Sequence, residues 1–387
     1  MENVRLGIIG IGNMGMSHSL RIHREHKVPG MTLGAVCDIN LERRTWAQEN
    51  LPGVAVFEHA TELYESGLID AVLIAVPHYD HPSLAIEAFA SGLHVLIEKP
   101  AGVYTKQVLE MNAAAKQSDK VFGIMYNQRT NPVYQKVREL VQSGELGELK
   151  RVVWIITDWY RPQAYHDSGS WRSTWEGEGG GTLINQNPHN LDLLHWMLGM
   201  PRRIRSFCSF GKYYDIEVED DVTAYLEYPN GATGVYITST GEAPGTNRLE
   251  ISGDMGKIVV ENNRITFDRN RISEREHNRL NVDPFRKPVC WRCEIPVSGD
   301  GGEQHIGIFK NFAKAILQGE KLLAPGEDGI HGLLISNAIH YSTWTDDWAE
   351  LDRFDHEHFY ELLQERIKSS TVKKNVVQKV VDVSGTH

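Results

Sequence analysis

The first third of the chain alternates short apolar runs with amphipathic stretches. The apolar runs occupy residues 4–9, 31–37, 71–76, 94–97 and 121–126, and helical patterns occupy residues 17–26, 81–91 and 106–116. Strands that are buried on both faces read as continuous apolar runs, and helices between them cover both faces of a parallel sheet. The pattern therefore predicts a doubly wound α/β domain of the Rossmann type over residues 1–127.

After residue 127 the pattern changes to a helix at 132–143 and longer alternating strands, at 150–159, 222–228, 232–238, 249–252 and 257–261. Asn230-Gly231 lies between two of these strands, and this dipeptide favours a tight antiparallel hairpin. We therefore expect a second, α+β domain over residues 128–350, with an open mixed or antiparallel sheet. Two late helices, at 306–317 and 332–344, have no strand between them and should pack on this sheet or on the first domain. Residues 351–387 should form a helix and a loose tail.

Composition narrows the class of protein. A chain of 387 residues is long enough for two domains that need no disulfide or metal for stability. Its 40 basic and 51 acidic residues give a net charge of −11, which disfavours nucleic acid and anionic membranes as partners. No apolar run reaches the ~18 residues of a membrane span, and the N-terminus has no signal-peptide pattern, which favours the cytoplasm. The four scattered cysteines predict reduced thiols and no metal site, and the acidic cluster at 217–221 predicts a solvated turn.

A glycine loop follows the first predicted strand. Gly10, Gly12 and Gly15 fit the pattern G-x-G-x-x-G, and the next strand ends in Asp38. In this arrangement a helix N-terminus holds a pyrophosphate and the acid accepts a hydrogen bond from the adenosine ribose. Asn13, Met14 and Ile39 are expected to join these contacts. The alternative is a tight turn beside a surface Asp.

The acid also bears on the choice between NAD and NADP. The carboxylate of Asp38 would repel a 2′-phosphate but accept a bond from a free hydroxyl. NAD is therefore favoured over NADP, although Arg43 and Arg44 follow closely and could reach a phosphate.

Two further motifs suggest a family. Residues 92–100 read Gly-Leu-His-Val-Leu-Ile-Glu-Lys-Pro, and the glycines at 179–181 are followed by Asn185 and His189. With the glycine loop, over residues 4 to 350, they resemble the Gfo/Idh/MocA oxidoreductases, the group of glucose-fructose oxidoreductase and inositol dehydrogenase. The resemblance implies a Rossmann domain, an open mixed sheet and dimers or tetramers formed through that sheet, whose apolar alternation at 235–240 would otherwise be exposed. The contacts with the cofactor that it adds are Ala75, Val76, Pro77, His78, His81, Glu98, Lys99 and Gln128.

The chemistry can also be argued from the residues. Oxidation of a secondary alcohol needs one group to take the hydroxyl proton and another to hold the oxygen. A histidine, with a pKa of about 6.5, is mostly neutral at pH 7 and can accept a proton, whereas a lysine, with a pKa of about 10.4, is charged. We therefore expect His189 to be the base and Lys99 the cation that orients the oxygen. A proton relay between the two is the alternative.

Other polar residues point to a polyhydroxylated substrate. Asn185 stands where many relatives carry Asp, and its amide can bond hydroxyls but cannot accept a proton, which concentrates proton transfer on His189. Arg161, Trp171 and Arg172 belong to a stretch of interleaved aromatic and basic residues. Such residues suit a sugar ring, although they also suit a strand end packed by large side chains.

The leading hypothesis is an NAD-dependent dehydrogenase that acts on a ring secondary hydroxyl of a sugar, glycoside or cyclitol. A redox-neutral enzyme that cleaves glycosides through transient oxidation by NAD is the alternative. A dinucleotide or sugar sensor without catalysis is disfavoured, because both Lys99 and His189 are present.

Overall fold

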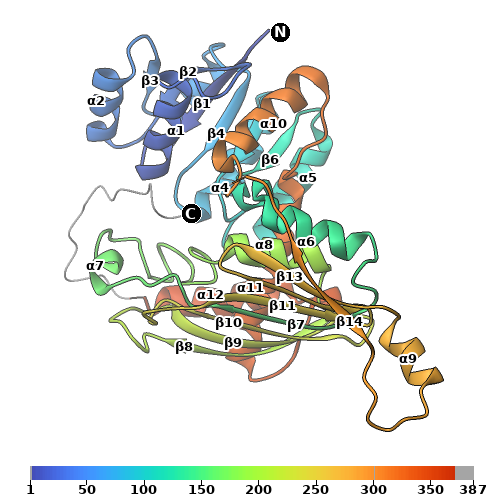
Figure 1. Cartoon of the computed structure of the whole chain (residues 1–387). Coiled ribbons are helices and arrows are strands. Elements are labelled where there is room, and N and C mark those ends of the chain that lie inside the picture. Colours follow the sequence, from blue (N-terminus) through green and yellow to red (C-terminus); the bar gives the residue numbers. More distant parts are fainter. Residues whose placement is uncertain (1, 300, 371–387) are drawn as a thin grey trace.

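Two β-sheets organise the computed structural model, which describes residues 2–299 and 301–370 (Figure 1). The first sheet is parallel throughout, and within the described residues its six strands lie in the order β3-β2-β1-β4-β5-β6. This order is that of a Rossmann fold, so the predicted α/β class is confirmed. The strands are β1 (Val4–Ile9), β2 (Met31–Cys37), β3 (Ala55–Phe57), β4 (Ala71–Ile74), β5 (His94–Ile97) and β6 (Phe122–Ile124).

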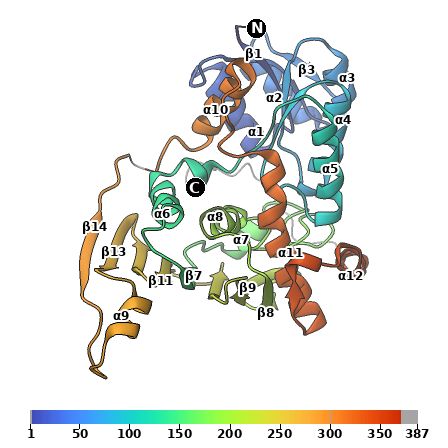
Figure 2. The same cartoon turned by 90° about the vertical axis from the view of Figure 1, so that its right-hand side faces the viewer.

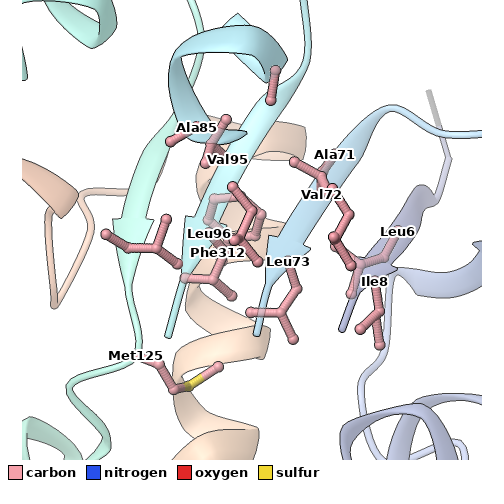
Figure 3. Close-up of a cluster of buried hydrophobic side chains, with 14 of the residues drawn as sticks. Leu6, Ile8, Ala71, Val72, Leu73, Ala85, Val95, Leu96, Met125 and Phe312 are labelled. Carbon is pink, nitrogen blue, oxygen red and sulfur yellow. The ribbon is translucent and has the colours of Figure 1, made fainter. Parts of the chain in front are cut away.

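The core of this part lies on both faces of the parallel sheet. Leu6, Leu73 and Leu96 from three neighbouring strands are fully buried. Figure 3 shows Leu73 and Leu96 beside Phe312, which comes from a helix far later in the chain, and Leu6 on the next strand. The helices that cover the sheet are α1 (Asn13–His23), α2 (Leu41–Asn50), α3 (Ala60–Glu65), α4 (His81–Ala90), α5 (Thr105–Gln117) and α10 (Gln304–Gln318). Burial from both sides explains the continuous apolar runs of these strands.

The second sheet is mixed, with the order β14-β13-β12-β11-β7-β10-β9-β8-β15 among the described residues. Strand β10 runs parallel to β7, and every other neighbouring pair is antiparallel. The predicted hairpin is present: β9 and β10 pair, and Gly231 between them has a φ of +83°. The strands are β7 (Leu149–Ile156), β8 (Arg203–Phe210), β9 (Glu219–Glu227), β10 (Thr233–Ser239), β11 (Asn247–Gly253), β12 (Gly256–Glu261), β13 (Arg264–Asn270), β14 (Cys290–Ile295) and β15 (Ala349–Glu350).

The helices that pack on the second sheet cover the face that is turned toward the first sheet (Figure 2). They are α6 (Pro132–Gln142), α8 (Pro188–Leu198) and α11 (Gly329–Thr345), with α12 (His356–Lys368) beside α11. The short helices α7 (Gln163–His166) and α9 (Glu274–Leu280) lie outside this layer, and single 3-10 turns are η1 (His78–Asp80), η2 (Asn127–Thr130), η3 (Gly326–Asp328) and η4 (Leu351–Arg353). Among the described residues, no helix lies over the opposite face of the sheet in either view.

The two late helices pack on different sheets. Helix α10 supplies Phe309 and Phe312 to the core of the first sheet, whereas α11 packs on β8 and α8. The final predicted helix corresponds to α12, and most of the expected loose tail, residues 371–387, lies outside the described residues. Among the residues that the structure describes, no helix combines the length and apolarity that crossing a membrane would require.

Candidate active site

The glycine loop, residues 10–15, has the shape of a dinucleotide cradle. Gly10 has a φ of +88°, a conformation that favours glycine, and it follows β1 directly. A Cβ atom on Gly15 would lie 1.9 Å from the Gly10 carbonyl oxygen, whereas a Cβ on Gly12 would meet nothing within 4 Å. Helix α1 begins at Asn13, followed by Met14, and no side chain caps its first amides. The loop is therefore packed tightly on its inner side and open above Gly12, as a bound pyrophosphate requires.

Asp38, at the end of β2, is tied to this loop. Its Oδ2 accepts a hydrogen bond from the Ile11 amide at 2.7 Å, and its Oδ1 accepts one from the Asn40 amide at 2.8 Å. A carboxylate has about four acceptor sites, so it retains capacity for the hydroxyls of a ribose. The neighbouring Ile39 is 80% exposed.

Both arginines that could have favoured NADP already contact other residues of the protein. Arg44 donates to the Asp38 carbonyl oxygen at 2.9 Å and forms an ion pair with Glu58 at 3.0 Å. Arg43 contacts the sulfur of Met16 at 3.2 Å. The residues present thus fit the ribose of NAD better than a 2′-phosphate.

The end of β4 leads into two buried histidines. After Ala75, Val76 and Pro77, the ring nitrogens of His81 lie 2.8 Å from the carbonyl oxygens of Val76 and Pro100, so this ring joins the segments that follow β4 and β5. The ring of His78 lies 3.3 Å through Nδ1 from the Glu178 carbonyl oxygen. Burial, helped by His81 and Lys99, strongly lowers the pKa of His78, which keeps that ring neutral.

The end of β5 carries Glu98 and Lys99. His18 Nε2 lies 2.7 Å from Glu98 Oε1 in a buried contact. Burial alone would raise the pKa of Glu98, but the hydrogen bond and positive charge supplied by His18 lower it to about 2. Lys99 Nζ donates to the carbonyl oxygen of Asn185 at 2.8 Å. The lysine after β5 thus reaches the glycine turn of the second part of the chain.

That glycine turn, residues 179–185, is fixed by a carboxylate from β9. Glu219 accepts hydrogen bonds from the amides of Gly181 and Leu183 at 2.9 Å, and His340 Nε2 lies 2.9 Å from its Oε2. The prediction of a solvated turn at 217–221 is therefore wrong at its centre, because Glu219 and Asp220 are 1% and 0% exposed. Burial would raise the pKa of Glu219, but His340 and the amide donors hold it below its usual value.

His189 lies in the first turn of α8, which begins at Pro188, a residue whose fixed φ suits the first helical position. Asn187, just before the helix, is fully buried and donates from Nδ2 to Thr182 and Thr238 at 2.7 and 2.8 Å. The ring of His189 lies 6.3 Å from that of Tyr126, at the end of the first part of the chain. Asn185 lies on the preceding loop, so the two residues are not on one helical face.

The interleaved aromatic and basic stretch packs as a cluster. Arg172 lies over the rings of Tyr165 and Trp171, at 4.7 and 4.6 Å from their centroids, and donates to the Tyr165 hydroxyl oxygen at 2.9 Å. Arg161 lies 5.3 Å from the centroid of the same tyrosine. The ring of Trp171 lies 5.9 Å from that of His78. The structure thus brings the predicted substrate residues beside the residues that follow β4.

Comparison with known proteins agrees with this geometry. Residues 4–126 match the family model described as "Oxidoreductase family, NAD-binding Rossmann fold", and residues 134–259 match the "GFO/IDH/MocA C-terminal domain". The chain belongs to the Gfo/Idh/MocA oxidoreductases. The expectations of a dehydrogenase and of NAD as its cofactor are confirmed.

Named relatives of this Gfo/Idh/MocA oxidoreductase span nearly the whole chain. A levoglucosan dehydrogenase from Pseudarthrobacter phenanthrenivorans is 25% identical, over 91% of this chain and 99% of its own length. A myo-inositol 2-dehydrogenase from Thermotoga maritima is 24% identical, over 87% and 95% respectively. The crystal structure of the WlbA dehydrogenase from Bordetella pertussis, in complex with NADH and UDP-GlcNAcA, shares the fold with a TM-score of 0.76 at 24% identity, covering 91% of this chain and all of that one.

Two polar residues of this Gfo/Idh/MocA oxidoreductase escaped the sequence analysis. The Tyr165 hydroxyl oxygen receives donors from Arg172, from Asn185 at 3.2 Å and from Gln186 at 3.3 Å. Glu178 is 2% exposed, and its Oε1 lies against the Asn185 amide nitrogen. The only signal for either was position: Tyr165 lies within the aromatic and basic stretch, and Glu178 directly precedes the glycines.

A buried ion pair joins the hinge segment of this oxidoreductase, residues 126–129 after β6, to α8. Arg129, 1% exposed, binds both oxygens of Asp192 at 2.7 and 2.9 Å, and also Asp328 at 2.8 Å. The neighbouring Gln128 donates to the Gln304 side chain at 3.1 Å, at the first residue of α10. These contacts hold the segment after β6 against the helix that carries His189.

Proposed function

We propose that the protein transfers a hydride between NAD and a ring secondary hydroxyl of a sugar, glycoside or cyclitol. The observation that carries the proposal is the contact from Lys99 Nζ to the Asn185 carbonyl oxygen, at 2.8 Å. Through it, a cation at the carboxyl end of the parallel sheet, where ligands of such sheets bind, lies against the turn that leads to His189. The glycine loop and Asp38 would hold the cofactor, whose nicotinamide accepts or supplies the hydride.

The residues divide the proton chemistry between them. His189 takes the proton of the hydroxyl, because a neutral imidazole is the ordinary base near pH 7. Lys99 donates a hydrogen bond to the reacting oxygen and stabilises the negative charge that grows on it. Burial lowers the pKa of Lys99, while the carboxylates of Glu98 and Glu178 oppose this effect. A relay in which the proton passes between Lys99 and His189 is the alternative division.

The substrate class follows from the cluster of aromatic and basic residues. Trp171 and Tyr165 offer flat apolar faces, and Arg161 and Arg172 offer planar donors, a combination that suits a ring with many hydroxyls. The relatives named for levoglucosan and myo-inositol, a sugar derivative and a cyclitol, support this class.

Substrate oxidation is measured with glucosides, aldoses and inositols, each with NAD and with NADP, by the absorbance of the reduced cofactor. We expect stoichiometric NADH with one substrate class. Glycoside cleavage without net NADH would indicate the redox-neutral alternative, and no response to any polyol would contradict the proposal.

The division of roles has its own test. His189→Ala should remove the acidic limb of the pH profile of kcat while NAD still binds with the wild-type Kd. If the variant keeps that limb, His189 is not the base.

We also propose that the protein is a homodimer or homotetramer that associates through the uncovered face of the second sheet. Val153, Val235 and Tyr225 are cross-strand neighbours on that face, and Phe207 nearby is 64% exposed. Such an apolar patch is unusual on a monomer. Light scattering should report a dimer or tetramer, and Val235→Glu should shift it toward monomer. A monomeric wild type would refute the proposal.

A further inference from the structure

Glu178 is a buried carboxylate between the two parts of the candidate site. Its Oε2 accepts a hydrogen bond from the Ser173 amide at 2.6 Å, and its Oε1 lies against the amide nitrogen of Asn185. Its own carbonyl oxygen lies 3.3 Å from His78 Nδ1. Glu178 therefore contacts both the segment that follows β4 and the glycine turn, residues 179–185. Lys99 reaches the same turn from the end of β5.

The first effect of Glu178 concerns Asn185. The amide nitrogen of Asn185 donates to Glu178 and to the Tyr165 hydroxyl oxygen, at 3.2 Å for the latter. A side-chain amide has two N–H donors, so both are used within the protein. Asn185 then offers a substrate only its carbonyl Oδ1, an acceptor that binds the hydrogen of a hydroxyl.

The second effect concerns the charge of Lys99. Just after β5, the carboxylate of Glu98, which is already bonded to His18, raises the pKa of Lys99. After β4, Lys99 in turn helps to lower the pKa of His78. From the segment at residues 157–178, the carboxylate of Glu178 raises the pKa of Lys99, whereas the guanidinium groups of Arg172 and Arg161 lower it. Burial and the two arginines favour the neutral amine, so the carboxylates are what favours the ammonium ion.

We propose that Glu178 is a positioning residue that supplies, from the position before the glycines, the carboxylate that position 185 lacks. It holds the Asn185 amide by its nitrogen and keeps Lys99 charged. The inference rests on the proposed function, since it assigns Lys99 the role of a cation beside the reacting oxygen. Because Glu178 acts through Asn185 and Lys99, it need not touch the substrate.

The charge of Lys99 can be measured without turnover. In the protein without cofactor, the rate at which acetic anhydride modifies Lys99 is followed by mass spectrometry across pH, and its midpoint gives the lysine pKa. Loss of a nearby opposite charge should move this midpoint to lower pH by about 1 in Glu178→Gln. Glu176→Gln removes an exposed carboxylate two residues away and should leave the midpoint unchanged. Equal midpoints in Glu178→Gln and wild type would overturn the proposal.

Kinetics supply a second readout. If Lys99 acts as a cation, activity falls at high pH as the lysine loses its proton, and Glu178→Gln should move this fall to lower pH by the same amount. KM should also rise severalfold, since the freed Asn185 amide no longer presents its oxygen alone. An unmoved alkaline limb in a folded Glu178→Gln contradicts the role given to Glu178.

Two further outcomes keep the tests separate. If the wild type oxidises no polyol, the proposed function fails while the Lys99 midpoint still decides the role of Glu178. If Glu178→Gln does not fold, Glu178→Asp replaces it. That variant keeps the charge but not the reach to Asn185, so the Lys99 midpoint should stay in place while KM rises. A wild-type KM in Glu178→Asp would overturn the positioning role.

Discussion

Replacement of Asp192 by asparagine tests the buried ion pair that joins α8 to the hinge segment. Arg129 makes two charge-assisted bonds to Asp192, at 2.7 and 2.9 Å, and keeps Asp328 as its second carboxylate partner. An asparagine would keep one acceptor oxygen and turn an N–H group toward the other guanidinium donor. Because both partners are 1% exposed, breaking the pair should cost about 3–5 kcal/mol. This corresponds to roughly two to four orders of magnitude in the unfolding equilibrium.

The assay is urea unfolding at pH 7, followed by tryptophan fluorescence and far-UV circular dichroism. Asp192→Asn should lower the midpoint of the transition that reports α8 without changing its slope. Arg203→Met is the matched control, because its pair with Glu227 is about one-third exposed and should contribute less than about 1 kcal/mol. If Asp192→Asn loses no more stability than Arg203→Met, the reasoning about burial is refuted.

Three further predictions concern the cofactor site. Gly15→Ala should weaken NAD binding, measured by calorimetry, by at least about tenfold, because its Cβ would lie 1.9 Å from the Gly10 carbonyl oxygen; wild-type affinity would contradict the packing argument. Asp38→Ser should raise kcat/KM for NADP relative to NAD by about tenfold or more, since it removes a like charge from the 2′ position; an unchanged ratio would show that Asp38 does not select the cofactor. Glu98, with a pKa of about 2 when folded and about 4.3 when unfolded, should contribute about 3 kcal/mol of stability above pH ~4.3 that is lost as the pH falls toward 2. Unfolding free energies measured from pH 5 to pH 3 should therefore fall less steeply in Glu98→Gln, and parallel curves would count against the linkage.

The elements that could be predicted are those whose burial is uniform. Strands β1, β2 and β5 are covered on both faces, so their apolar runs mark their bounds without error. Strand β8 was missed because its inward positions include Ser206, whose hydroxyl is satisfied by the Ile339 carbonyl oxygen at 2.6 Å. A polar residue with a buried partner breaks the alternation on which sequence analysis depends. Strand β14 was missed because most of its side chains are exposed.

The residues of the candidate site also fall into two groups, those that a sequence motif reveals and those that only the fold reveals. Glycines and the Glu-Lys-Pro motif are local, so their spacing was visible along the chain. The roles of Glu178 and Glu219 depend on contacts with residues of distant or unpredicted segments, such as the bond from Gly181 to Glu219. A run of acidic residues normally indicates solvent, and only the fold shows that β9 carries Glu219 beneath the glycine turn.

Helix α10 gives the parallel sheet a late partner. Figure 2 shows α10 beside the strands of this sheet. Phe309 and Phe312 of α10 fill the core of the sheet, and the Ile124 amide at the edge of the sheet donates to the Ala324 carbonyl oxygen at 3.1 Å. During synthesis, the first 127 residues therefore leave the ribosome with one apolar flank uncovered, and about 190 further residues must follow before that flank is closed. At a translation rate of about 5–20 residues per second this interval lasts on the order of 10–40 s. The nascent chain thus exposes an apolar surface throughout the synthesis of the second sheet. A fragment that ends at residue 127 should aggregate unless α10 is added back.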